Sequence, residues 1–141
     1  MGGLVDASNS IYFDDMPDGI TSKGNRKNNK LKGTKYDDTL LGYGGKDKLL
    51  GTKGDDIIDC GTWHKKPDVA NGGKGSDTFV IKEGYWTYIK DFNVQEDILD
   101  LTGLRNGLSW EYTDGKTFIY GKKYEVAFFK GYQNLDEATL V

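Results

Sequence analysis

The chain of 141 residues has one cysteine, one histidine, two prolines and no run of 18 apolar residues. Cys60 alone cannot form an internal disulfide, and His64 alone cannot build a conventional zinc cluster. The missing apolar run argues against a membrane span, and the N-terminal MGGLVDASNS lacks the basic and apolar regions of an ordinary signal peptide. Cys60 is therefore expected to be structural, and any secretion is expected to use another route.

The sequence also lacks a catalytic constellation. No serine stands in a nucleophile-elbow context, and the Gly-Gly-Lys tripeptides lack the Gly-Lys-Ser/Thr ending of a phosphate-binding loop. The carboxylates are numerous, but they fall at regular spacing and mark no cleft of the kind that a glycosidase needs. We therefore expect a binding protein and not an enzyme; an independent hydrolase would need activity that survives mutation of these acids.

Composition divides the chain into unlike parts. The hydrophobic content of 36% is low, and half of the 20 glycines lie between Gly33 and Gly75, whereas most aromatic residues follow Thr78. We expect an N-terminal edge-capping segment over residues 1–23, a repeat domain over 24–80 and a β-rich C-terminal part over 81–141.

The repeat domain is built from nine-residue units. Four consecutive units, GNRKNNKLK, GTKYDDTLL, GYGGKDKLL and GTKGDDIID, run from Gly24 to Asp59. A twelve-residue block from Cys60 to Asn71 carries a three-residue insertion around Trp63 and His64, and GGKGSDTFV then restores the pattern. The eighth position of each unit is apolar: Leu31, Leu40, Leu49, Ile58, Ala70 and Phe79.

This apolar ladder needs only a thin core. Three residues of each unit can form a short strand, while the glycine-rich remainder turns the chain, because glycine enters positive φ at low cost. Two units then make one coil of 18 residues, and stacked coils pair their strands in parallel. Each unit is stabilised by its neighbours, as in other solenoids.

Stacking brings the acids at the sixth position together. Rungs about 4.8 Å apart place like charges close enough to repel, by roughly 1 kcal/mol in water and about 3 kcal/mol at an effective dielectric of 20. A hard cation would cancel that repulsion, because carboxylates and carbonyls supply the oxygens that calcium prefers. The two rows are Asp38, Asp56 and Asp77 on one side, and Asn29, Asp47 and Asp68 on the other.

The unit GGKGSDTFV matches the consensus G-G-x-G-x-D-x-U-x, so the chain resembles the RTX (repeats-in-toxin) calcium-binding β-roll. IKDFNVQEDILDLTGL resembles the segment that follows the roll in the C-terminal domain of serralysin-type secreted proteases. The resemblance implies an all-β fold, with a right-handed parallel β-roll of nonapeptide repeats followed by a short antiparallel capping region. It implies calcium ligands at Asp38, Asp47, Asp56, Asp68 and Asp77, at the carbonyls of Gly33, Gly42, Gly51, Gly54, Gly72 and Gly75, and at Asp91 and Asp97 in the post-repeat motif.

Several positions depart from the consensus. Asn29 replaces the first acid, Tyr36 replaces a fourth-position glycine, and Lys35, Lys53 and Lys74 place a row of cations near the calcium edge. About three filled calcium sites are therefore expected. A flexible Gly/Asp-rich linker is the alternative, but a linker has no reason to keep acids and aliphatic residues in phase. We expect the roll to fold when calcium binds, because ion binding supplies folding free energy.

The sequence of the C-terminal part predicts β-strands. Asp114-Gly115 lies between two β-rich runs, a strong hairpin signal, and predicts a three-stranded meander over about 109–129 that caps the roll. The aromatics are expected more often in the core than on a binding platform, and Trp63, Trp86 and Trp110 are the ones to test. The terminal NLDEATLV resembles the signal of proteins exported by type I secretion, so we expect a secreted, extracellular and monomeric protein with a C-terminal secretion signal.

Two further stretches could bind ligands. Asp14, Asp15 and Asp18 lack the full spacing of an EF-hand loop and are expected to be surface acids. The basic run KGNRKNNKLKGTK could contact an anionic polysaccharide, through Lys27, Lys30 and Lys32; nucleic acid is not expected, because aromatics are not interleaved with the charges. The second hypothesis is accordingly an accessory module that binds an acidic extracellular polysaccharide.

Overall fold

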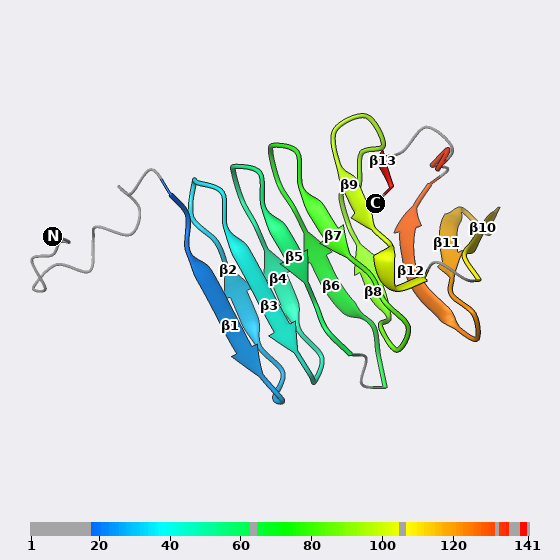
Figure 1. Cartoon of the computed structure of the whole chain (residues 1–141), viewed down its shortest axis with the longest axis horizontal. Helices are drawn as coiled ribbons and strands as arrows, with labels where there is room; N and C mark the ends of the chain where they lie inside the picture. The colour runs from blue at the N-terminus through cyan, green and yellow to red at the C-terminus, as the bar shows by residue number, and fades with distance from the viewer. Residues whose placement is uncertain (1–17, 63–64, 105–106, 132, 136–138, 141) are drawn as a thin grey trace, which may run out of the picture.

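The computed structural model describes residues 18–62, 65–104, 107–131, 133–135 and 139–140. Two β-sheets face each other, and the chain passes from one to the other at every turn of the roll (Figure 1). Sheet A has the order β1 (Thr21–Asn25), β3 (Thr39–Tyr43), β5 (Ile57–Asp59), β7 (Thr78–Val80), β9 (Ile98–Asp100) and β13 (Thr139–Leu140). Sheet B has the order β2 (Lys30–Lys32), β4 (Lys48–Leu50), β6 (Asp68–Asn71), β8 (Thr87–Ile89), β12 (Glu125–Lys130), β11 (Lys116–Tyr120) and β10 (Ser109–Thr113).

The register of the strands follows the repeat. Leu31 pairs with Leu49 and Leu40 with Ile58, so equivalent residues of successive units stack on one another. The same parallel pairing continues past the last unit, since β6 pairs with β8 and β7 with β9. The roll thus crosses the expected boundary at residue 80 without a break in either sheet.

The core lies between the two sheets, along the eighth positions. Leu40, Leu49, Ile58, Ala70 and Phe79 are buried, and Leu31, at the N-terminal end of the roll, is partly buried. The ladder continues with Ile89 and Leu99 at equivalent positions in β8 and β9. Each nine-residue unit from Gly33 on therefore contributes one buried apolar side chain to the core, and the twelve-residue unit contributes Cys60 as well as Ala70.

The C-terminal strands close the other end of the roll. Asp114 and Gly115 both have positive φ and join β10 to β11 in the predicted hairpin. β12 pairs in parallel with β8 and β13 with β9, so the last strand of the roll in each sheet is covered. Inside, Phe92 stacks on Phe129 with ring centroids 4.8 Å apart. The antiparallel meander therefore caps the roll and extends sheet B.

The expected all-β class, with a parallel β-roll followed by antiparallel strands, is confirmed. β1 begins the roll at Thr21, and Asp18 is exposed. The predictions for Asp14, Asp15, Trp63 and His64 lie outside the described residues. Within the described ranges, no helix is long and apolar enough to span a membrane.

Candidate metal centre

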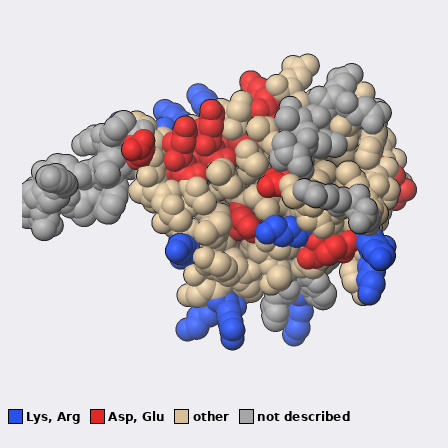
Figure 2. Space-filling model, in the orientation of Figure 1, with Lys and Arg blue, Asp and Glu red and all other residues tan. Residues whose placement is uncertain are grey.

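The sixth-position acids form two buried ladders at opposite edges of the roll. The Asp56 ladder, of Asp38, Asp56, Asp77 and Asp97, lies at the turns that enter sheet A; the Asp68 ladder, of Asn29, Asp47 and Asp68, lies at the turns that enter sheet B. The five repeat aspartates are at most 2% exposed. Next to the buried aspartates in the sequence, Asp37 and Asp55 are exposed. Figure 2 shows acidic side chains gathered along the upper edge of this face.

One oxygen of each carboxylate ties two coils together. The backbone N–H of Asp38 donates to Asp56 Oδ1 at 2.8 Å, and that of Asp56 donates to Asp77 Oδ1 at 2.9 Å. In the Asp68 ladder, the N–H of Asp47 donates to Asp68 Oδ1 at 2.7 Å. These bonds fix the positions of the carboxylates in the folded roll.

The second oxygen of four carboxylates has no such partner. Among the described residues, Oδ2 of Asp47, Asp56, Asp68 and Asp77 is buried without any hydrogen bond. An unpartnered buried carboxylate oxygen is costly, because its hydration is lost and nothing replaces it. The residues that carry them are neighbours in the ladders, Asp56 with Asp77 and Asp47 with Asp68, and each pair of carboxylates is a candidate for part of a cation's oxygen shell.

Three other predicted ligands are satisfied by the protein itself. Asp38 Oδ2 accepts the N–H of Thr34 at 2.6 Å, and the Thr34 hydroxyl donates to the same carboxylate. Asp91 accepts the N–H groups of Gly72 and Gly73, and Asp97 Oδ2 accepts that of Asn93 at 2.8 Å. The structure therefore assigns backbone partners to both oxygens of these carboxylates, which sequence reasoning could not separate from the others.

Glycines at the first position leave space beside the unpartnered oxygens of Asp47, Asp56 and Asp77, whereas the unit of Asp68 has Cys60 at that position. A Cβ at Gly51 would lie 2.3 Å from Asp56 Oδ2 and 2.7 Å from the Gly72 carbonyl oxygen. A Cβ at Gly42 would lie 2.5 Å from the Cys60 carbonyl oxygen and 2.7 Å from Asp47 Oδ2. Each space is thus bordered by a carboxylate and a carbonyl oxygen, which is the donor set of calcium.

The Cys60 carbonyl oxygen was not among the calcium ligands expected from the sequence. Cys60 occupies the first position of the irregular twelve-residue unit, where the other units carry glycine, and that register is the signal that could have found it. Its side chain lies in the core, as expected for a structural cysteine, and burial raises the pKa of the thiol well above its usual value.

Gly33 has the same surroundings as Gly51, since a Cβ there would meet Asp38 Oδ2 at 2.4 Å and the Gly51 carbonyl oxygen at 2.7 Å, although Asp38 Oδ2 already has hydrogen-bond partners. A Cβ at Gly72 would meet Asp77 Oδ2 at 2.2 Å. Gly54 and Gly75 have φ of 96° and 113°, and a Cβ at either would strike the backbone of the neighbouring coil. These fourth-position glycines are therefore required for the turn and for close stacking of the coils. Lys53 and Lys74 pair at an isolated bridge, so the predicted row of exposed cations does run alongside these turns.

Burial dominates the electrostatics of both ladders. Desolvation raises the pKa of Asp56, Asp68 and Asp77 to about 7, against backbone hydrogen bonds that lower it. Neighbouring carboxylates add to the rise, and the pKa of Asp47 and Asp97 is also raised by burial. Burial thus disfavours the charged form of these carboxylates, and either a proton or a bound cation would offset that cost near neutral pH.

The donor set fits calcium better than a transition metal. In the described part of the chain, no three His, Cys, Asp or Glu side chains converge on one point, so an ion would need backbone carbonyls besides two carboxylates. Oxygen-only ligands of this kind suit a hard cation. The residues present therefore fit calcium on the strength of the unpartnered Oδ2 atoms and the adjacent carbonyls.

Comparisons with known proteins identify the repeat and the fold. Residues 23–58 match the family model of the RTX calcium-binding nonapeptide repeat, in four copies. No curated protein matches the chain. The solution structure of the AlgE6R3 subunit of the Azotobacter vinelandii mannuronan C5-epimerase is similar, with a TM-score of 0.63 and 25% identity over 84% of this chain and 80% of that chain.

The AlgE6R2 subunit of the same epimerase shares the fold, with a TM-score of 0.58 and 24% identity over 86% of this chain and 91% of that chain. The family match covers the first four units, with the sixth-position residues Asn29, Asp38, Asp47 and Asp56, and the structural match extends beyond them. The chain is therefore an RTX β-roll that carries calcium-binding nonapeptide repeats.

Proposed function

We propose that this β-roll folds on binding calcium at two places, between Asp56 and Asp77 and between Asp47 and Asp68. The observation that carries the proposal is the set of four buried Oδ2 atoms without a hydrogen bond. In both pairs neither Oδ2 atom has a hydrogen-bond partner, whereas the Oδ2 atoms of Asp38 and Asp97 each accept a backbone N–H. Two ions are fewer than the number, about three, expected from the sequence, because Asp38 is already satisfied by Thr34.

The chain's own residues prepare these sites. The Oδ1 hydrogen bonds orient the carboxylates, the first-position glycines leave space beside Oδ2, and the carbonyls of Gly72 and Cys60 border that space. Calcium, when bound, would supply the positive charge that the stacked carboxylates lack. Without it, like charges about 4.8 Å apart oppose the stacking of coils.

A calcium titration at two pH values tests this proposal. The folded-state pKa of Asp56, Asp68 and Asp77 is raised from 3.8 to about 7. Without metal, their contribution to stability is therefore fully present below pH 3.8 and lost as the pH rises through 7. In chelator, we expect the β signal in circular dichroism to be weak at pH 8 and stronger at pH 5. Calcium should restore it at pH 8, with a smaller effect at pH 5, and metal-free stability that rises with pH would contradict the proposal.

We also propose that the protein is secreted and acts outside the cell. Extracellular calcium would then fold a chain that stays loose where free calcium is low. This proposal is supported by the RTX repeats together with the C-terminal NLDEATLV, whose Thr139 and Leu140 pair with β9. To test it, the C-terminal part is fused to a reporter protein in cells that contain a type I secretion apparatus. Export of the reporter would support the proposal, and retention of the reporter in the cells would contradict it.

Binding of an acidic polysaccharide is the second candidate function. Lys30, Lys32, Lys48 and Lys90 line a shallow groove of about 260 Å³ on the outer face of sheet B, and Lys30 pairs directly with Lys48. The similar AlgE6R3 subunit belongs to a mannuronan epimerase, and mannuronan is a polymer of sugar carboxylates. Lys27, in the turn before β2, does not line this groove.

Neutralising the groove should weaken binding to such a polymer. We expect Lys30→Gln with Lys48→Gln to lower the affinity for polymannuronate by about twofold to tenfold, because each exposed ion pair contributes little by itself. Lys65→Gln with Lys66→Gln removes the same charge from another exposed stretch and should change little. Equal losses in both variants, or no retention of the parent on the polymer, would count against this function.

A further inference from the structure

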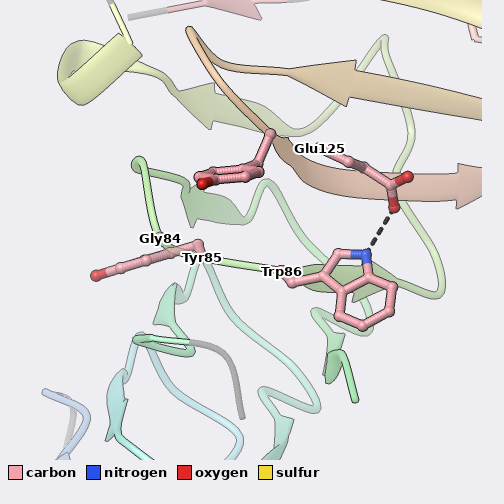
Figure 3. A pocket seen from close by; sticks show the side chains of 5 residues that line it. Gly84, Tyr85, Trp86 and Glu125 are labelled. Atoms are coloured by element: carbon pink, nitrogen blue, oxygen red, sulfur yellow. Dashed lines mark hydrogen bonds between the residues drawn. The ribbon is translucent and has the colours of Figure 1, made fainter. Parts of the chain in front are cut away.

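A pocket beside the last coil of the roll has no role in the functions above. It has a volume of about 380 Å³ and is lined by Gly84, Tyr85, Trp86, Tyr124 and Glu125. Tyr85 and Trp86 come from the segment before β8, and Glu125 begins β12, so the pocket lies where the cap meets the roll. Figure 3 shows the Glu125 carboxylate above the Trp86 indole, and the Tyr85 side chain leaving the backbone in the direction opposite to the indole.

The roll holds two of the aromatic rings in place. Tyr85 is 9% exposed, and its hydroxyl donates to Asp59 Oδ1 at 2.7 Å. The backbone carbonyl of Trp86 accepts the N–H of Asp68 at 2.9 Å. Tyr124, in contrast, is 65% exposed, so it contributes an accessible ring at the mouth. The pocket is therefore preformed on the roll side and open to solvent on the cap side.

The polar groups of the pocket favour a positively charged ligand. The Trp86 indole N–H donates to Glu125 Oε1 at 2.6 Å, and the Tyr85 hydroxyl is committed to Asp59. Among the described residues that line the pocket, Glu125 supplies the only formal charge, and none is a lysine or arginine. Three aromatic rings and one carboxylate, with most side-chain donors already used, attract a cation through ring quadrupoles and charge.

We propose that Tyr85, Trp86, Tyr124 and Glu125 form a binding site for a quaternary ammonium group of the choline type. A quaternary ammonium has no hydrogen to donate, is weakly hydrated, and fits between aromatic faces that cannot replace the hydration of a smaller ion. An anionic sugar would meet the Glu125 carboxylate, and a neutral sugar would find few free donors. Gly84 leaves the rim open, since a Cβ there would meet nothing within 4 Å.

Choline and tetramethylammonium chloride are the probes for this site. The titration uses the full chain in saturating calcium, with the folded state checked by circular dichroism, so that failure of the roll to fold is seen separately. We expect a saturable shift of the Trp86 indole N–H resonance, with a dissociation constant on the order of millimolar. The neutral carbon isostere of choline, in which carbon replaces nitrogen, should bind at least about fivefold more weakly.

Two variants separate charge from shape. Glu125→Gln keeps an acceptor for the Trp86 N–H but removes the charge, and Tyr124→Ala removes an exposed ring that the fold does not bury. Each should weaken choline binding by about fivefold, whereas Tyr112→Ala, at an exposed ring outside the pocket, should not. Equal binding of the neutral isostere, an unchanged affinity in Glu125→Gln, preference for a neutral sugar, or no saturable shift with choline would each overturn the proposal.

Discussion

Replacing both Asp56 and Asp77 by asparagine is expected to stabilise the metal-free roll and to remove one calcium ion. Asparagine Oδ1 can keep the backbone hydrogen bonds that Asp38 and Asp56 donate, while the unpartnered charged oxygens disappear. Relief of two buried, unsatisfied charges should raise the free energy of unfolding in chelator by about 2 kcal/mol or more. Urea unfolding at pH 8, with and without calcium, measures both effects.

The variant Asp38→Asn is the matched control for this prediction. Its Oδ2 accepts the N–H of Thr34, so an amide nitrogen at that position would face a donor. We expect Asp38→Asn to destabilise the metal-free roll by about 1 kcal/mol, with the opposite sign to the double variant. A double variant that is less stable than the parent in chelator would show that the Asp56 and Asp77 carboxylates do not destabilise the metal-free roll.

Substitution of Gly51 by alanine is expected to disturb the same site by filling its space. The backbone at Gly51 is not in the left-handed region, so the obstacle is steric: the Asp56 carboxylate and the Gly72 carbonyl must move. Overpacking of this kind costs about 1 to 3 kcal/mol, and we expect calcium affinity to fall by about tenfold or more. Calorimetric titration with calcium and urea unfolding measure the two losses.

Gly44→Ala serves as the control, since it lies in the neighbouring unit and a Cβ there would have its nearest contact at 3.7 Å. It should change stability by less than about 0.5 kcal/mol and leave calcium affinity unchanged. Similar behaviour of the two variants would mean that the space beside Asp56 plays no part in binding.

The strict nine-residue period is what made the roll predictable. Because the sixth and eighth positions recur in phase, Asp56 and Ile58 could be placed on their ladders without knowledge of tertiary structure. The hairpin at Asp114-Gly115 was predictable for a similar reason, since its turn chemistry is local.

Contacts that the period does not encode could not be read from the sequence. The roll continues through β8 and β9 although residues 81–97 contain no glycine-rich unit, because apolar residues and backbone pairing suffice there. Thr34 satisfies Asp38 through a contact that depends on side-chain geometry. Tyr43 and Thr52 adopt positive φ at second positions where the consensus has glycine, a strain that neighbouring coils must offset.

The pocket at the cap was also beyond sequence reasoning. Trp86 and Glu125 are 39 residues apart in the chain and are joined only by the docking of β12 on β8. The aromatics were expected more often in the core than on a binding platform, yet Trp86 is half-buried at the wall of an open pocket. Long-range pairing, rather than local pattern, decides which aromatic residues remain accessible.

Anomalous scattering from crystals grown with saturating calcium would show directly whether the buried Oδ2 atoms are calcium ligands. We expect ions bound by Asp56 with Asp77 and by Asp47 with Asp68, each in contact with the Oδ2 atoms that lack a hydrogen bond. A well-ordered roll in which these four carboxylates contact no ion would contradict this expectation.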